Sequence, residues 1–129
     1  MKQKKFSVTD RIKSFKYAFN GLKILLNEEH NARIHLIAAI CAIAFSIYFE
    51  ISATEWVAVV FAIGFVFAME LINSSIENIS DFVSPGKNES IKKIKDLSAA
   101  SVLISAITAF TVGLIVFIPK VIELIQIEL

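Results

Sequence analysis

The chain has few of the residues that interrupt or cross-link a fold. Its 129 residues include one cysteine, two prolines and four glycines. The one cysteine, Cys41, excludes an intrachain disulfide, and its place in an apolar run predicts a small buried apolar residue. Neither a repeat nor a glycine-rich linker divides the sequence, so residues 1–129 are predicted to form a single domain.

Charge is also scarce and nearly balanced. Only 19% of the residues are charged, and the formal net charge is +1. A nucleic-acid partner would require a concentrated basic surface, so no such partner is expected. Hydrophobic residues make up 56% of the chain and its mean hydropathy is +0.68, which lies above the usual range of soluble proteins.

Three apolar runs account for this excess: Ile34–Ile51, Trp56–Ile72 and Leu97–Ile118. A helix needs roughly 18 to 20 apolar residues to cross a bilayer, and the first and third runs meet that length. The second run is shorter than this. It is expected to span the membrane if its polar inner turn lies at the headgroups or faces a protein interior. The sequence predicts an all-α integral membrane protein with three transmembrane helices, at about residues 31–51, 54–82 and 91–120.

A fourth helix is predicted before the first run, over residues of about 7–27. Apolar residues recur there at three- and four-residue spacing, and they are Ile12, Phe15, Phe19, Leu22 and Leu26. Lysines lie largely away from this stripe, which indicates an amphipathic helix at the membrane surface with its lysines toward anionic headgroups. An ordinary helix packed on a soluble core is the alternative interpretation.

The basic residues indicate the topology. Eight lysines and arginines precede the first apolar run and four lysines lie between the second and third, whereas the loop between the first and second has none. By the positive-inside rule, the N-terminus and the 82–96 loop face the cytoplasm and the C-terminus faces outward. The polar N-terminus predicts that no cleavable signal peptide is present.

One helix face carries the most informative polar residues. At about 100° per residue, one side of the helix over residues 69–85 holds Glu70, Asn73, Ser74, Glu77 and Asp81. Carboxylates in a membrane helix are costly and indicate a functional site. With Glu29, Lys95 and Asp96 at the same membrane level, they predict a site for a divalent cation and a phosphate-bearing ligand. His30 and His35, five residues apart, are not expected to bind a metal.

The same residues resemble the signature of a known family. The segment ELINSSIENISD, from Glu70 to Asp81, resembles the motif of the small prokaryotic diacylglycerol kinases: Glu, two residues, Asn, Ser or Thr, a small and an apolar residue, Glu, three residues, Asp. Lys95-Asp96 before an Ala/Ser-rich span resembles the second motif of that family. The resemblance covers about residues 7–120 and implies a homotrimer in the bacterial cytoplasmic (inner) membrane that phosphorylates a lipid hydroxyl with MgATP at sites between subunits.

The resemblance also implies a role for individual residues. Glu70 corresponds to the general base that contacts the lipid hydroxyl, and Glu29 and Glu77 correspond to carboxylates that bind Mg²⁺. The positions that correspond to nucleotide contacts are Tyr17, Glu29, Glu77, Gly86, Lys87, Asn88, Lys95 and Asp96. The expected supporting residues are Asn73, Asp81 and Arg11, and Ala99 stands at a lipid-contacting position.

Some positions depart from the better-known pattern. Asp10 stands in place of a nucleotide-binding arginine of the family. The neighbouring Arg11 is the candidate to replace that arginine. One step along a helix turns a side chain by about 100°, so the sequence does not decide whether Arg11 reaches the nucleotide. Ala99 replaces a lipid-contacting serine, and Gly113 replaces a tryptophan. The leading expectation is phosphorylation of diacylglycerol to phosphatidic acid, and the alternative is an undecaprenol kinase that makes undecaprenyl phosphate. A remote alternative is a non-catalytic membrane oligomer that uses the same carboxylates.

Overall fold

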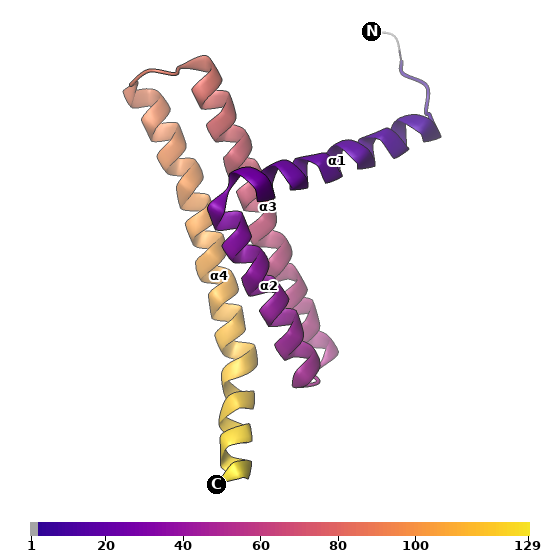
Figure 1. Cartoon of the computed structure of the whole chain (residues 1–129), viewed down its shortest axis with the longest axis vertical. Helices are drawn as coiled ribbons and strands as arrows, with labels where there is room; N and C mark the ends of the chain where they lie inside the picture. Colours follow the sequence, from indigo (N-terminus) through magenta and orange to yellow (C-terminus); the bar gives the residue numbers. More distant parts are fainter. Residues whose placement is uncertain (1–2) are drawn as a thin grey trace.

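Helices account for all the regular structure of the described chain. A computed structural model describes residues 3–129, and within that range it contains four helices and no strand. The helices are α1 (Val8–Glu28), α2 (His30–Tyr48), α3 (Ala53–Val83) and α4 (Glu89–Glu128). Figure 1 shows α2, α3 and α4 as an elongated bundle from which α1 projects sideways. The prediction of an all-α fold is confirmed.

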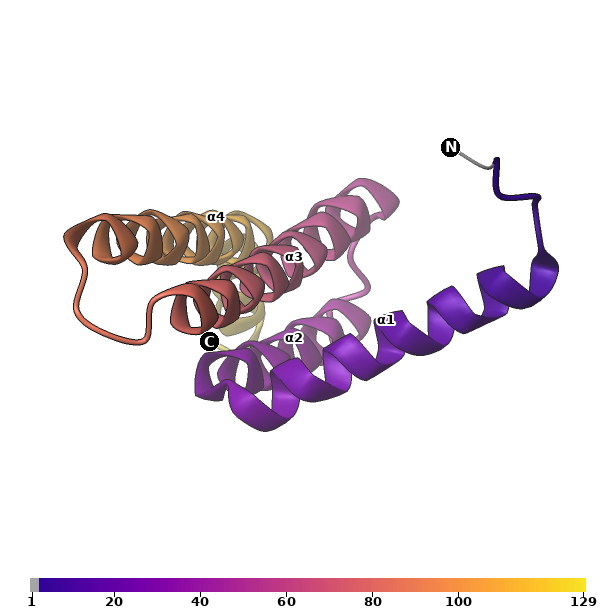
Figure 2. The same ribbon diagram turned by 90° about the horizontal axis from the view of Figure 1, so that it is seen from above.

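Three of the helices, α2, α3 and α4, are long and apolar enough to cross a membrane. Helix α3 packs along α4 most extensively and also packs against α2, as the view along the bundle in Figure 2 illustrates. Small buried side chains such as Ala39, Ser46 and Ser105 allow the backbones to approach closely. Most large apolar side chains remain exposed within the single chain, as expected for helices that face lipid or another subunit.

The prediction that Cys41 is buried is wrong, because its side chain is exposed. The buried residues of α2 are Ala32, Ala39 and Ser46, which recur every seven residues and therefore lie on one face. Cys41 follows Ala39 by two positions, so it lies about 200° around the helix from it. The apolar run alone does not distinguish the protein-facing side of α2 from the outward-facing side.

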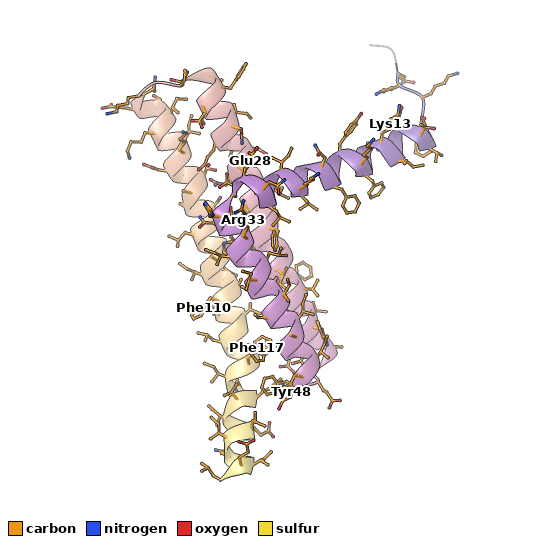
Figure 3. All side chains as sticks on the ribbon, in the orientation of Figure 1. Lys13, Glu28, Arg33, Tyr48, Phe110 and Phe117 are labelled. Atoms are coloured by element: carbon orange, nitrogen blue, oxygen red, sulfur yellow. The ribbon has the colours of Figure 1, made fainter. Side chains whose placement is uncertain are left out.

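The junction of α1 with α2 determines where α1 points. Arg33 of α2 donates a hydrogen bond from Nε to the carbonyl oxygen of Leu26 at 2.7 Å and another from its guanidinium to the carbonyl of Asn27. These bonds satisfy carbonyls that the end of α1 leaves unpaired. Figure 3 shows Arg33 and Glu28 at this junction and Lys13 near the far end of α1. The apolar stripe of α1 remains exposed, and its position at the membrane surface remains a prediction.

The end of the bundle near the α2–α3 turn has an apolar core. Ile51, Val59 and Val116 are buried together there, and Phe45, Phe49 and Phe117 pack beside them with ring centroids 6.2 to 6.5 Å apart. Figure 3 labels Phe117 and Tyr48 in this region.

Local hydrogen bonds define the turn between α2 and α3. The amide of Ile51 donates to Ser46 and that of Glu50 to Ile47, both at 3.2 Å, which is the Schellman pattern at a helix end. Glu50 takes the left-handed conformation that this pattern requires, with φ of 49°. Ser52 and Glu55 then begin α3 with a reciprocal capping box. Glu55 Oε1 also lies 3.3 Å from Lys120 Nζ, which connects the start of α3 to α4.

Helix α4 continues beyond the expected end of the third span near residue 120. It passes through Pro119 and reaches Glu128. Proline removes one backbone N–H donor from the helix. The residues that follow are still mainly apolar, and a backbone in apolar surroundings is best satisfied by remaining helical.

Candidate active site

Glu70 lies inside the bundle on α3, with only 2% of its side chain exposed. His35 of α2 approaches it, and the distance from His35 Nε2 to Glu70 Oε1 is 3.2 Å. This partner is not predictable from the sequence, because only the packing of α2 on α3 brings the two residues together. The available signal was an ionisable side chain within an apolar run, which is itself an indication of function in a membrane helix.

Oxygen Oε1 of Glu70 has no hydrogen-bond partner among the described residues. His35 Nε2 is close enough, but its N–H is not aligned to form a hydrogen bond with that oxygen. A buried acceptor without a partner costs about 1–3 kcal/mol, and a charged one costs more. Buried polar atoms of this kind are rare and demand an explanation, for which a ligand hydroxyl would suffice.

The polar face predicted on α3 runs from the interior of the bundle to its surface. Asn73 and Ser74, one turn after Glu70, are both buried. Ser98 of α4 donates a hydrogen bond to Asn73 Oδ1 at 2.8 Å, so this amide links the two helices. Further along the same face, Glu77 is half-buried and Asp81 is exposed. The face therefore connects a buried carboxylate with groups that water and a nucleotide can reach.

Glu29 and Glu77 are the two expected metal ligands, and both are half-buried. Glu29 lies at the corner between α1 and α2, where its side chain makes no capping hydrogen bond. Within residues 3–129, no three His, Cys, Asp or Glu side chains gather closely enough to hold a metal unaided. Two carboxylates do suit the Mg²⁺ of a nucleotide complex, which takes its other ligands from phosphates and water.

The connection between α3 and α4 brings together most of the expected nucleotide contacts. A hollow of about 610 Å³ lies there, and its lining includes Asp81, Gly86, Lys87, Asn88, Lys95 and Asp96. Lys95 forms an ion pair with Asp81, and Lys92 Nζ lies 2.6 Å from Asp96 Oδ2. The lysines give this hollow donors that suit phosphate groups.

The structure does not bring three of the expected residues to this region. Tyr17 and Arg11 lie on α1, which points away from the α3–α4 connection in Figure 1. The guanidinium of Arg11 instead lies 5.6 Å from the ring centroid of Phe6. Ala99 is exposed on α4 and does not line the cavity near Glu70. A single chain therefore does not bring Tyr17 and Arg11 to the α3–α4 connection, and Ala99 does not line the cavity.

A cavity of about 400 Å³ lies between α2, α3 and α4. Of the residues in the described range, His35 is the only polar one that lines it. Seven of its fifteen lining residues are alanine or glycine, so the space exists because small side chains face it. Gly113 is one of these, and a Cβ atom at Gly113 would meet no atom within 4 Å. An apolar chain with its polar end beside His35 would suit such a cavity.

The sequence of residues 16–117 matches the family described as prokaryotic diacylglycerol kinase. The chain belongs to the prokaryotic diacylglycerol kinase family. It is similar to the undecaprenol kinase of Bacillus subtilis strain 168, with 32% identity over 108 residues, which cover 84% of this chain and 88% of that protein. It is also similar to the diacylglycerol kinase of Helicobacter pylori strain 26695, with 33% identity over 109 residues, covering 79% and 85%. The diacylglycerol kinase of Escherichia coli K12 is 28% identical over 98 residues, covering 76% and 80%.

Membership in the prokaryotic diacylglycerol kinase family establishes the class of activity. The protein is a kinase that uses ATP and a lipid, and the family and the three apolar helices together indicate a membrane protein. The remote alternative of a non-catalytic membrane oligomer is wrong. The relatives carry two different lipid names, so family membership alone does not choose between undecaprenol and diacylglycerol.

Proposed function

We propose that the protein transfers the γ-phosphate of ATP to the terminal hydroxyl of undecaprenol, producing undecaprenyl phosphate and ADP. The family resemblance by itself favours diacylglycerol. The apolar cavity beside His35 and Glu70 favours undecaprenol instead, and it is the observation on which the proposal rests. The similarity to the undecaprenol kinase of Bacillus subtilis favours the same lipid.

Undecaprenol and diacylglycerol differ in the polar atoms that they would bring into the cavity. Undecaprenol is a long isoprenoid chain that ends in one hydroxyl and has no other polar group. Diacylglycerol carries two ester groups near its hydroxyl, and carbonyls removed from water are costly unless they accept hydrogen bonds. A cavity lined by one polar side chain suits the first lipid better than the second. Ala99, which lacks the hydroxyl of the serine expected at that position, also removes a donor for an ester or glycerol oxygen.

In the proposed reaction, the lipid hydroxyl reaches Glu70 from the cavity. Its oxygen forms a bond to the γ-phosphorus while the bond from that phosphorus to the β–γ bridging oxygen breaks, and the proton passes to the Glu70 carboxylate. A positioned general base contributes roughly 10²–10⁴-fold to such a step. The unpartnered Oε1 of Glu70 is available to accept this proton, and Asn73, held by Ser98, keeps the adjacent turn in place.

The nucleotide is proposed to lie along the polar face toward the α3–α4 connection. Glu29 and Glu77 would hold Mg²⁺, which neutralises phosphate charge when it is bound with ATP. Lys87, Lys95 and Asp96 border the hollow where the phosphates and nucleoside would lie. The distance along α3 from Glu70 to Glu77 is about 10 Å, because two helical turns separate them. That spacing leaves the lipid end and the nucleotide end of the site distinct.

The proposed assembly is a homotrimer with the N-terminus and the 82–96 loop in the cytoplasm and the C-terminus outside. The course of α1 supports it, because α1, which carries Tyr17 and Arg11, runs away from the α3–α4 connection of the same chain (Figure 2). A neighbouring copy could receive them and complete a nucleotide site between subunits. Cross-linking of single-cysteine variants in a Cys41→Ala background tests both the stoichiometry and the topology.

Diacylglycerol is the second candidate substrate. The relatives from Helicobacter pylori and Escherichia coli are named for it, and their similarity to this chain is of the same order. The deciding experiment is MgATP-dependent phosphorylation by purified protein in detergent, with undecaprenol and diacylglycerol offered in parallel. We expect a higher kcat/KM for undecaprenol, and a clear preference for diacylglycerol would contradict the proposal.

A cavity-filling variant strengthens this experiment. Gly113→Leu adds a side chain at a position that lines the cavity and has open space around it. We expect it to raise KM for undecaprenol without changing KM for ATP. Gly64→Leu is the matched control, because Gly64 has equally open surroundings but does not line the cavity.

A further inference from the structure

We propose that His35 is a positioning residue of this kinase, which holds the Glu70 carboxylate at the end of the apolar cavity where the lipid hydroxyl arrives. The inference rests on the proposed function, in which Glu70 accepts the proton of that hydroxyl. It adds a residue to which the motifs at Glu70–Asp81 and Lys95-Asp96 assign no role.

The position of His35 between the cavity and Glu70 supports this role. His35 lines the cavity and is 23% exposed at its side chain, whereas Glu70 is 2% exposed and does not line the cavity. Nε2 of His35 lies 3.2 Å from Oε1 of Glu70. A lipid chain that fills the cavity therefore has His35 as its only polar neighbour in the lining. The next polar group beyond it is the Glu70 carboxylate.

The physical need for such a residue follows from where Glu70 lies. A glutamate has several rotatable bonds, and the contact of His35 Nε2 at 3.2 Å is the interaction with a described residue that can restrict Oε1. The imidazole reaches it from a different helix, so the orientation of the carboxylate depends on how α2 packs against α3. Reacting groups require close alignment, and a displacement of about 1 Å can reduce turnover roughly 100-fold.

Three substitutions of His35 separate positioning from packing. In His35→Gln the amide nitrogen can reach the place of Nε2, in His35→Asn it falls short, and His35→Ala removes the donor. We expect His35→Ala and His35→Asn to lower kcat for the lipid about 100-fold with KM for ATP unchanged. We expect His35→Gln to restore most of this loss. The matched control is His30→Ala, because His30 is exposed at the start of the same helix.

A second comparison tests whether His35 acts through Glu70. In a Glu70→Gln background, His35→Ala should cause no additional loss of turnover, because the base that it positions is already absent. Independent, multiplicative losses would overturn the proposal. So would wild-type kcat in His35→Ala, or an equal loss in His35→Gln and His35→Ala accompanied by a lower unfolding midpoint, which would indicate a packing role.

An infrared measurement keeps this inference separate from the proposed function. The carboxylate band of Glu70 is obtained as the difference between the wild-type protein and Glu70→Gln, without lipid or nucleotide. We expect this band to shift in His35→Ala and to return in His35→Gln. Absence of lipid phosphorylation by the wild-type protein would overturn the proposed function, whereas an unchanged band in His35→Ala would overturn the role of His35.

Discussion

The end of the bundle that holds Glu70 and the end that holds Ile51 bury different kinds of side chain. Near Glu70, the buried residues include the polar Asn73, Ser74 and Ser98. Near Ile51, the buried residues are Val59 and Val116, with phenylalanine rings packed beside them. Both ends belong to the same three helices, so the difference lies in what each end buries and not in the backbone that carries it.

The local interactions differ in the same way. At the Ile51 end, a capping box, a Schellman turn and the Glu55–Lys120 ion pair all support the same geometry. At the Glu70 end, a buried carboxylate oxygen lacks a hydrogen bond, and a cavity runs from the neighbouring His35 toward Val59 and Phe117 of the other end. Natural proteins depart from such consistency chiefly at functional sites. The comparison indicates that one end stabilises the bundle and the other retains unsatisfied groups for a ligand.

The largest expected effect comes from Glu70→Gln. It should reduce kcat by roughly 10²–10⁴-fold, because the amide cannot accept the lipid proton. Binding of MgATP should persist, since the nucleotide end of the polar face is unchanged. The measurement pairs turnover in micelles with calorimetric nucleotide binding. A variant with near-normal turnover would remove Glu70 from the role of general base.

A substitution at the Ile51 end should lower the stability of the bundle and leave its catalytic turnover unchanged. Ile51→Ala should lower the free energy of unfolding by about 2–5 kcal/mol, because it removes buried methylene and methyl groups from a packed core. The turnover of the folded fraction should remain near wild type. Reversible unfolding in mixed micelles measures the first quantity. The control is Ile37→Ala, whose side chain is 63% exposed; an equal loss there would contradict the assignment of the core.

Glu77→Gln tests the nucleotide half of the Glu70 end. It should weaken Mg²⁺-dependent binding of ATP by at least roughly tenfold, since a neutral amide is a poorer ligand for a hard cation. Lipid binding should be little affected. A titration of a non-hydrolysable ATP analogue with and without Mg²⁺ provides the measurement, and unchanged Mg²⁺ dependence would exclude Glu77 as a ligand.

Glu50→Gly should stabilise the Ile51 end further. Glu50 has a left-handed backbone, which costs a non-glycine residue about 1 kcal/mol and costs glycine almost nothing. A higher unfolding midpoint with unchanged kcat is expected. Glu123→Gly, placed within the regular helix α4, should lower the midpoint instead, and a gain in both variants would contradict the explanation from φ.

The smallest effect concerns the link between Asn73 and Ser98. Single alanine substitutions and the double variant form a cycle whose coupling energy should be about 0.6 kcal/mol, the usual size for a hydrogen bond between membrane helices. A coupling indistinguishable from zero would mean that the observed 2.8 Å contact adds nothing to the packing of α3 on α4.

Much of the site was predictable wherever residues follow one another on a single helix. The face from Glu70 to Asp81 follows from helical periodicity, and the structure does align Asn73 and Ser74 with Glu70 toward the interior. Likewise, the turn residues near Gly86 and Lys95 in the second turn of α4 border one hollow because the α3–α4 connection is short. Contacts of this local kind follow from spacing along the chain.

Contacts between helices were not predictable in this way. His35 and Glu70 come from α2 and α3, and the angular position of each helix about its own axis decides whether they meet. The apolar runs are hydrophobic on every side, so their sequences do not indicate which side of each helix faces protein. The exposure of Cys41 and the opening beside Gly113 have the same origin.

The sequence by itself determined three apolar helices long enough to span a membrane and a row of carboxylates on one of them, since hydrophobic length and helical period are properties of a single segment. The kinase activity followed from the family to which the sequence belongs. Only the tertiary structure decided that His35 meets Glu70 and that small residues of three helices enclose a cavity beside them. The physical reason is that these features depend on the rotation and separation of packed helices, which many side chains set jointly.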